Sequence, residues 1–129
     1  KALHIPSQRM ATLIHPSAVI GFDSKIEPGC IICSHTTLQP GTQLGMNSIV
    51  RAGANLGHDC QIGPYVDIGP NVSICGYAKV AEGSHVAPNA VVRDNIQVGS
   101  YSTISAGAVI LRDVPADSTW IGNPARRVM

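Results

Sequence analysis

The chain has 129 residues, enough for one domain, and its hydrophobic content of 44% is ordinary for a globular protein. It holds only one Phe, one Trp and three Tyr, so its interior must be built from Val, Ile, Leu and Ala. The net charge of +1 comes without a basic cluster, which argues against nucleic acid or anionic lipid as a partner. No apolar run could span a membrane and no signal-peptide pattern opens the sequence, so we expect a cytoplasmic protein.

An aliphatic residue recurs at every sixth position through residues 12–113. The seventeen positions are Ile14, Ile20, Ile26, Ile32, Leu38, Leu44, Val50, Leu56, Ile62, Ile68, Ile74, Val80, Val86, Val92, Val98, Ile104 and Ile110. A small residue lies two positions before most of them, and a turn former such as Gly41 lies three positions after many. A six-residue period of this kind is typical of a parallel β-helix, with the small and aliphatic side chains pointing inward.

Three hexads close one triangular coil of eighteen residues, so residues eighteen apart should be stacked neighbours on about six coils. We expect residues 1–11 to cap the first coil, because open coil ends expose unpaired strand edges. After Ile110 the period fails, and residues 114–129 should form a departing strand and tail.

A histidine and an aspartate interrupt the repeat at one corner, in "LGHDCQIGPYVDIG". His58 follows Leu56 by two positions and therefore belongs to a protruding corner, where Gly76 should be its stacked neighbour one coil later. A histidine base beside an accessible backbone N–H could serve acyl transfer, with Asp59 orienting the imidazole and increasing its basicity. The alternative is that His58 is only a hydrophilic corner residue.

The segments "TLIHPSAVIG", "GHDCQIGPYVDIGPN", "ICGYAKVAEGSHVAPNAVV" and "IGNPARRV" resemble bacterial sugar acetyltransferases of the sialic acid O-acyltransferase type, including enzymes that N-acetylate nucleotide-linked 4-amino sugars. The resemblance implies an all-β, left-handed β-helix, since the periodicity alone does not fix the hand. It also implies a homotrimer that uses acetyl-CoA without a metal and acts on a small-molecule acceptor, such as a sugar or nucleotide sugar, in sites between subunits.

By the same resemblance, His58 is the general base, Asp59 tunes it, and the N–H of Gly76 stabilises the oxyanion. Pro88 and Ala106 match positions that hold acetyl-CoA through the backbone, and Arg126, with Arg127, could reach the CoA phosphates. Direct attack of the acceptor is expected, because no nucleophilic Ser or Cys appears beside His58.

Two positions depart from the pattern of the family. Asp67 stands where relatives often carry a histidine, and we expect it to bind the cofactor with altered contacts to the thioester. Arg51 stands where an Asn commonly precedes the motif, which could change contacts to the acceptor. Asp67 should also stack against His85, a pair that we interpret as structural. Relatives normally carry an N-terminal nucleotide-sugar domain before the β-helix, which predicts either a removed domain or a short form of the enzyme.

Two other classes of protein share this fold. A catalytically silent trimeric scaffold or regulatory domain would keep the hexads without needing His58 or Gly76. A zinc enzyme like the γ-carbonic anhydrases needs three converging histidines, and the histidine spacing here does not provide them. The four cysteines, Cys30, Cys33, Cys60 and Cys75, fall in different stacking columns and should be reduced structural residues.

Overall fold

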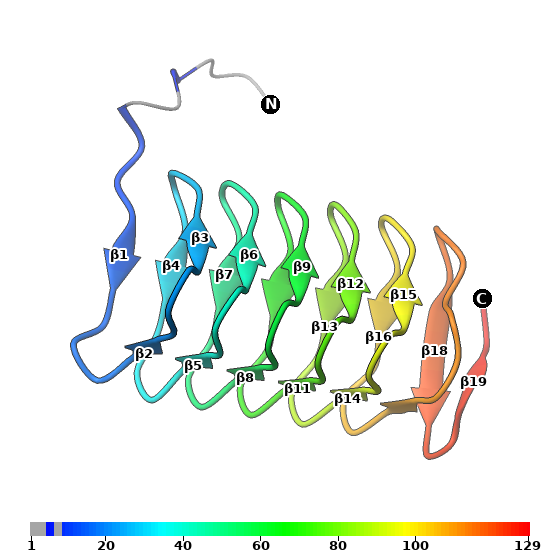
Figure 1. The fold of residues 1–129 in the computed structure, drawn as a ribbon. Helices are drawn as coiled ribbons and strands as arrows, with labels where there is room; N and C mark the ends of the chain where they lie inside the picture. The colour runs from blue at the N-terminus through cyan, green and yellow to red at the C-terminus, as the bar shows by residue number, and fades with distance from the viewer. Residues whose placement is uncertain (1–4, 7–8) are drawn as a thin grey trace.

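The structure is a computed structural model that describes residues 5–6 and 9–129. This described part contains nineteen strands and no α-helix, and the strands form three sheets (Figure 1). Sheet A contains β1 (Leu13–Ile14), β4 (Ile31–Ile32), β7 (Ile49–Val50), β10 (Asp67–Ile68), β13 (His85–Val86), β16 (Thr103–Ile104), β18 (Thr119–Gly122) and β19 (Ala125–Arg127). Sheet B contains β2 (Val19–Ile20), β5 (Thr37–Leu38), β8 (Asn55–Leu56), β11 (Ser73–Ile74), β14 (Val91–Val92) and β17 (Val109–Ile110). Sheet C contains β3 (Lys25–Ile26), β6 (Gln43–Leu44), β9 (Gln61–Ile62), β12 (Lys79–Val80) and β15 (Gln97–Val98).

The chain visits the sheets in the order A, B, C and then repeats, which makes a three-sided β-helix. Strands of neighbouring coils pair in parallel with an offset of eighteen residues, for example Leu13 with Ile31 and Ile74 with Val92. The predicted fold, a left-handed parallel β-helix of about six coils, is confirmed, and each of the seventeen aliphatic positions is the second residue of a strand.

The corners share a conformation that explains the turn formers in the sequence. From Asp23 to Gly107, one residue at each corner has a positive φ, and this residue recurs every six positions, as at Gly41, Gly53, Asp59 and Asn71. Gly, Asn and Asp tolerate this left-handed region better than other residues. These residue types therefore recur at most corners of the chain.

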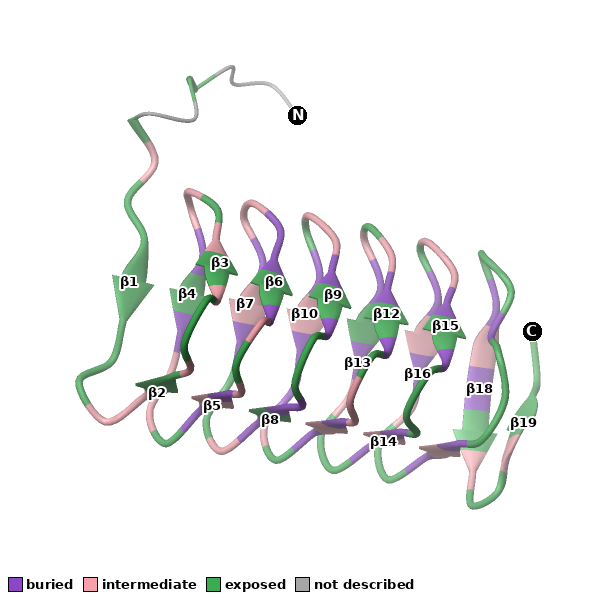
Figure 2. Ribbon diagram, in the orientation of Figure 1, coloured by how far each residue is buried: buried purple, intermediate pink, exposed green. Residues whose placement is uncertain are grey.

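Aliphatic side chains fill the interior of the prism (Figure 2). Ile32, Leu38, Ile68 and Ile104 are at most 1% exposed. Buried Ser, Thr and Cys side chains at the small positions donate to the carbonyl group fifteen residues later, as Thr42 does to Gly57 at 3.1 Å. These bonds satisfy polar groups that the interior would otherwise leave unpaired.

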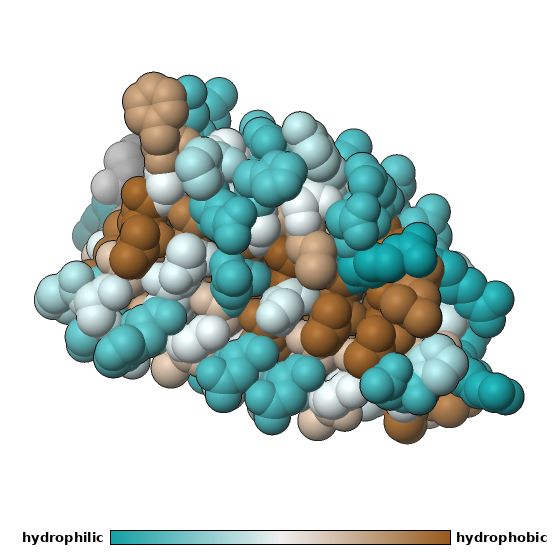
Figure 3. Space-filling view, turned by 60° about the horizontal axis from the view of Figure 1, so that its bottom comes forward, coloured by the Kyte–Doolittle hydropathy of each residue, from teal (hydrophilic) through white to brown (hydrophobic). Residues whose placement is uncertain are grey.

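The first coil differs from the others, because Ile14 and Ile20 are 44% and 36% exposed despite their inward positions. Apolar side chains accordingly gather at this end of the molecule (Figure 3). The expected cap comprises residues 1–11, of which 1–4 and 7–8 lie outside the described residues. Within the described residues, the inward side chains of the first coil are therefore open to solvent.

Coil stacking continues beyond residue 113, where the aliphatic period ends. Val114 bridges Val98, and Ile104 pairs with Trp120, so the offset in this last coil is sixteen residues instead of eighteen. Trp120 thus takes the inward position next to Ile104 and is 4% exposed. After it, β18 turns back into β19 as an antiparallel hairpin at the end of sheet A. No membrane-spanning helix is present among the described residues.

Candidate active site

His58 lies on the corner between β8 and β9, where sheet B gives way to sheet C. Its side chain is 52% exposed, and its Nδ1 lies 3.2 Å from Oδ2 of Asp59. Asp59 has φ of 59°, so the left-handed corner conformation turns its carboxylate toward the preceding imidazole. We assign the proton to Nδ1, which donates to the carboxylate and leaves Nε2 free to accept a proton.

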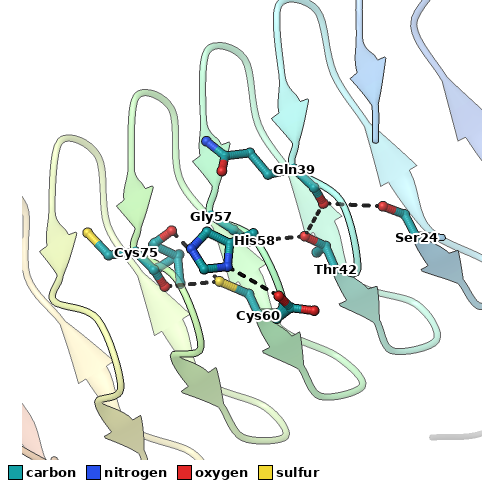
Figure 4. A network of polar contacts seen from close by, with 9 residues as sticks. Ser24, Gln39, Thr42, Gly57, His58, Cys60 and Cys75 are labelled. Carbon is teal, nitrogen blue, oxygen red and sulfur yellow. Dashed lines mark hydrogen bonds and ion pairs between the residues drawn. The ribbon is translucent and has the colours of Figure 1, made fainter. Parts of the chain in front are cut away.

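Gly76 lies against the imidazole, as the stacking arithmetic predicted. A Cβ atom at Gly76 would stand 2.6 Å from Nε2 of His58 and 2.9 Å from Cε1. The ring extends toward the coil of Cys75 (Figure 4) and occupies the space that a side chain at residue 76 would need. The absence of a side chain at this one position brings the imidazole close to the backbone of the neighbouring coil.

The N–H of Gly76 is available because of its place in the hexad. Prolines occupy the same hexad position at Pro28, Pro40, Pro64 and Pro70, which shows that the coil does not need an N–H there. Met46 occupies this position too, and its N–H donates to the carboxylate of Glu27 at 3.1 Å. Within the described chain, the Gly76 N–H has no acceptor, so it can donate to an oxyanion.

Two cysteines lie close to this corner and are held in the thiol form. The Cys60 thiol donates to the carbonyl oxygen of Cys75 at 3.1 Å (Figure 4), and burial raises its pKa to about 11. Burial also raises the pKa of Cys75, with a further contribution from the negative charge of Asp94. Neither thiol is activated as a nucleophile, in agreement with the expectation of direct attack. All four cysteines are free.

Asp67 belongs to a three-residue ion-pair ladder on sheet A, away from the His58 corner. Arg51 makes two hydrogen bonds to its carboxylate, Nε to Oδ1 at 2.9 Å and a terminal nitrogen to Oδ2 at 3.1 Å. Nδ1 of His85 lies 3.6 Å from the same Oδ2. The sequence predicted the stacking of Asp67 and His85. It did not predict the bonds between Arg51 and Asp67, because these residues are sixteen apart and are not stacked neighbours. The two positions that depart from the family pattern are therefore bonded to each other.

Pro88 and Ala106 lie on another corner, between sheets A and B, and both are exposed. Pro88 has no N–H, and its carbonyl oxygen accepts the N–H of Gly107 at 2.9 Å. Ala106 occupies the hexad position of Gly76, and its N–H likewise has no acceptor in the described chain. Because this corner and that of His58 are different edges of the prism, the structure does not bring the two sets together within one chain.

Arg126 lies in β19, opposite Ile121 in the terminal hairpin. Arg112, Arg126 and Arg127 line a hollow of about 530 Å³ together with Pro124. Arg112 also lies 5.5 Å from the centre of the Trp120 ring. The structure thus adds Arg112, which precedes the hairpin and which the sequence did not single out, to the predicted pair of arginines.

A larger groove of about 840 Å³ runs along sheet C. Its floor carries the outward side chains of Gln43, Gln61, Lys79 and Gln97, and residues 113–116 overhang one end. Gln61, which follows His58 by three residues, lines this groove, whereas His58 itself does not. No three His, Cys, Asp or Glu side chains converge as a metal site within residues 5–6 and 9–129.

The six-residue repeat and the three-sided β-helix that it builds define a hexapeptide-repeat protein, in which the His58 imidazole lies beside a free backbone N–H. The sequence profile named bacterial transferase hexapeptide (six repeats) matches residues 41–76 and 77–112, more than half of the chain. The chain belongs to this family.

Several solved structures of acetyltransferases resemble the chain. A single-site variant of perosamine N-acetyltransferase from Caulobacter crescentus, in complex with CoA and GDP-perosamine, is 27% identical over 93% of this chain, with a TM-score of 0.92. The acetyltransferase domain of PglB from Neisseria gonorrhoeae, in complex with acetyl coenzyme A, is 34% identical over 92% of this chain, with a TM-score of 0.91. The chain spans 57% and 58% of those two structures. Over 32 residues, 25% of this chain and 13% of the relative, it is 56% identical to serine acetyltransferase from Synechococcus elongatus.

Proposed function

We propose that the protein is an acetyl-CoA-dependent acetyltransferase that transfers acetyl to an amine or hydroxyl of a sugar or nucleotide-linked amino sugar. The observation that carries the proposal is the contact between His58 and Gly76, which joins a base and a free N–H in one corner. The similar structures that contain CoA with GDP-perosamine, or acetyl coenzyme A, support the choice of acetyl donor and acceptor.

In the proposed reaction, Nε2 of His58 removes the proton from the attacking amine or hydroxyl of the acceptor. The acceptor atom forms a bond to the thioester carbonyl carbon while the carbonyl oxygen becomes an oxyanion, to which the Gly76 N–H donates. Collapse of this intermediate breaks the carbon–sulfur bond, and the proton held by His58 neutralises the leaving thiolate. Asp59 keeps Nδ1 protonated and stabilises the imidazolium between the two steps.

The acetyl donor would be held by a neighbouring subunit of a homotrimer. Ala106 offers a free N–H and Pro88 a carbonyl oxygen on an edge that cannot face His58 in the same chain. In a trimer of parallel prisms, one edge of each chain can face a different edge of the next. The arginines of the terminal hairpin, including Arg126, would bind the CoA phosphates. Asp67, which Arg51 holds in place, would contact the acetyl donor near its thioester.

The alternative, a silent scaffold, differs from the enzyme in whether it binds acetyl-CoA. A ligand that binds only the native state raises Tm, so acetyl-CoA should stabilise the enzyme in a thermal melt. Reversing the charge of the hairpin with Arg126→Glu should reduce this shift if the arginine binds the CoA phosphates. A Tm that acetyl-CoA does not change would favour the scaffold.

The test of the proposed activity is thiol release from acetyl-CoA with a panel of amino sugars and nucleotide-linked 4-amino sugars. We expect His58→Ala to lower turnover by about a hundredfold or more, the usual contribution of a general base. His15→Ala, at another exposed corner, is the control and should leave turnover unchanged. Turnover that survives in His58→Ala would assign the chemistry elsewhere, and the Asp67–His85 pair would be examined next.

A further inference from the structure

Tyr77, which follows Gly76, contacts the imidazole of His58. The two ring centroids are 5.0 Å apart and the ring planes stand at 90°, an edge-to-face arrangement. The N–H of Tyr77 donates to the carbonyl oxygen of His58 at 3.0 Å, so the backbone bond between the two coils lies directly beside the ring contact. Tyr77 is eighteen residues after Asp59 and is therefore its stacked neighbour.

The backbone at Tyr77 is in a conformation that does not suit tyrosine. Its φ is 62°, in the left-handed region that the other corners fill mostly with Gly, Asn or Asp. In the same corner column, Asp59 precedes it and Asn95 follows it, both with positive φ. A bulky residue at such a position is uncommon, and it recurs in this chain at Tyr65 and Tyr101, so what distinguishes Tyr77 is its ring contact with His58. The corner therefore holds an aromatic ring where a better backbone former would fit.

The ring supplies a restraint that the other contacts do not give. The side chain of His58 is 52% exposed, and Asp59 holds only the Nδ1 edge of its imidazole. Gly76 leaves space beside Nε2 but has no side chain to hold the ring there. The Tyr77 ring stands perpendicular to the imidazole and adds a second side-chain contact to that of Asp59.

We propose that Tyr77 is a positioning residue that keeps Nε2 of His58 over the backbone of Gly76. The aromatic ring does this and the hydroxyl group is not required. The effect on catalysis rests on the proposed acetyl transfer, whereas the effect on the imidazole is a property of the protein alone.

Three variants separate positioning from folding. Tyr77→Asn removes the ring and places at this corner a residue that suits a positive φ, as Asn71 and Asn95 show. Tyr77→Phe keeps the ring. Tyr101→Asn is the matched control: Tyr101 has φ of 55° and lies over Gly83, as Asn71 lies over Gly53, and it is remote in sequence from His58.

The first readout is the NMR spectrum of the five histidine rings, in which His58→Ala identifies the His58 signals. Because loss of the ring current alone would shift the His58 signals, the measured quantity is the NOE between the ring protons of His58 and the α protons of Gly76, which report the position of the imidazole. Tyr77→Asn should weaken this NOE, while Tyr77→Phe and Tyr101→Asn leave it unchanged. In the acetyltransferase assay, Tyr77→Asn should lower kcat about tenfold, because small displacements of a reacting group are costly. Its KM for acetyl-CoA and its Tm should stay close to those of the unchanged protein, and Tyr77→Phe should restore kcat.

The proposal is overturned if Tyr77→Asn leaves the NOE between His58 and Gly76 unchanged, if Tyr77→Phe behaves like Tyr77→Asn, or if Tyr101→Asn has the same effects. The NMR result holds even if the protein releases no thiol with any acceptor, since that failure would concern the proposed function only. Conversely, an active enzyme in which Tyr77→Asn leaves this NOE unchanged would refute the positioning role and leave the acetyl transfer intact.

Discussion

Gly76 is the residue where local geometry makes the sharpest prediction. Gly76 does not have a positive φ, and alanine occupies its hexad position at Ala52 and Ala106, so the backbone of Gly76→Ala should fold normally. The new Cβ would stand 2.6 Å from Nε2 of His58 and must displace the imidazole. We expect a loss of about tenfold to a hundredfold in kcat with little change in Tm, measured by thiol release and thermal melting.

A double variant checks this interpretation of Gly76. If the added methyl group acts only by displacing the imidazole, His58→Ala combined with Gly76→Ala should be no slower than His58→Ala alone. A further loss in the double variant would show that the methyl group also disturbs the oxyanion or the acetyl donor.

Ionisation of Cys60 should lower the free energy of unfolding at alkaline pH. Burial raises the pKa of its thiol from 9.0 to about 11, so the unfolded chain loses this proton first as the pH rises. The contribution of Cys60 is present below pH 9 and is lost between pH 9 and 11, by about 2 kcal/mol in total. A serine at residue 60 should still donate to the carbonyl oxygen of Cys75, because Ser48 and Ser84 at equivalent positions donate to the carbonyl oxygen fifteen residues later. Cys60→Ser should therefore remove the pH dependence that the thiol causes.

The measurement for Cys60 is the free energy of unfolding in urea at several pH values from 7 to 11, with Cys33→Ser as a control at a thiol outside the buried small positions. Parallel curves for Cys60→Ser and the unchanged protein would contradict the assignment to Cys60.

Some contacts of the site could be predicted from the sequence and others could not, depending on whether the residues are eighteen apart. The contact between His58 and Gly76 was predicted from the sequence because eighteen residues separate them. The same spacing joins Asp59 to Tyr77, but the ring contact of Tyr77 with His58 was not predicted. The bonds from Arg51 to Asp67 were not predicted, because the two residues are not stacked neighbours. The long arginine side chain spans the distance between them. Periodicity predicts backbone neighbours, whereas side-chain direction and length decide which of them touch.

At the scale of the strands, the sequence predicted the position of every coil strand up to Ile110, because each hexad is a local signal repeated without interruption. It did not predict the sixteen-residue last coil, since two fewer residues break the period and Trp120 replaces an aliphatic residue. Nor did it predict the exposure of the first coil, because burial depends on what covers a strand and not on the pattern within it.

The difference between first and inner coils can be measured with one residue type in one column. Ile14 and Ile32 are paired neighbours in sheet A, but Ile14 is 44% exposed and Ile32 is 1% exposed. Ile32→Ala should cost about 2–5 kcal/mol of unfolding free energy, because it leaves a cavity between two coils. Ile14→Ala should cost about 1 kcal/mol or less, because that site is partly in water already.

Urea unfolding of both isoleucine variants at one protein concentration tests this difference, since an oligomer would make stability depend on concentration. Equal costs would show that the first coil is covered in solution as fully as the inner ones.

At the scale of the whole molecule, the prism edges predict that activity requires two chains. Variants at different edges should therefore rescue each other when mixed in one trimer. His58→Ala disables the base edge, and Ala106→Asp places a negative charge where the acetyl donor is proposed to bind. The backbone should tolerate this aspartate, because Asp94 occupies the same hexad position. Each variant alone should be nearly inactive, while their sedimentation should match that of the unchanged protein.

In a random equal mixture of the two chains, a site is intact when its base comes from an Ala106→Asp chain and its donor edge from a His58→Ala chain. Each condition holds about half the time, so co-expressed chains should recover about a quarter of full activity. His58→Ala mixed with Gly76→Ala is the control, because both changes lie on one edge and no arrangement restores it. Recovery in neither mixture would place the whole site on one chain or deny the trimer, and sedimentation of the unchanged protein would tell these two apart.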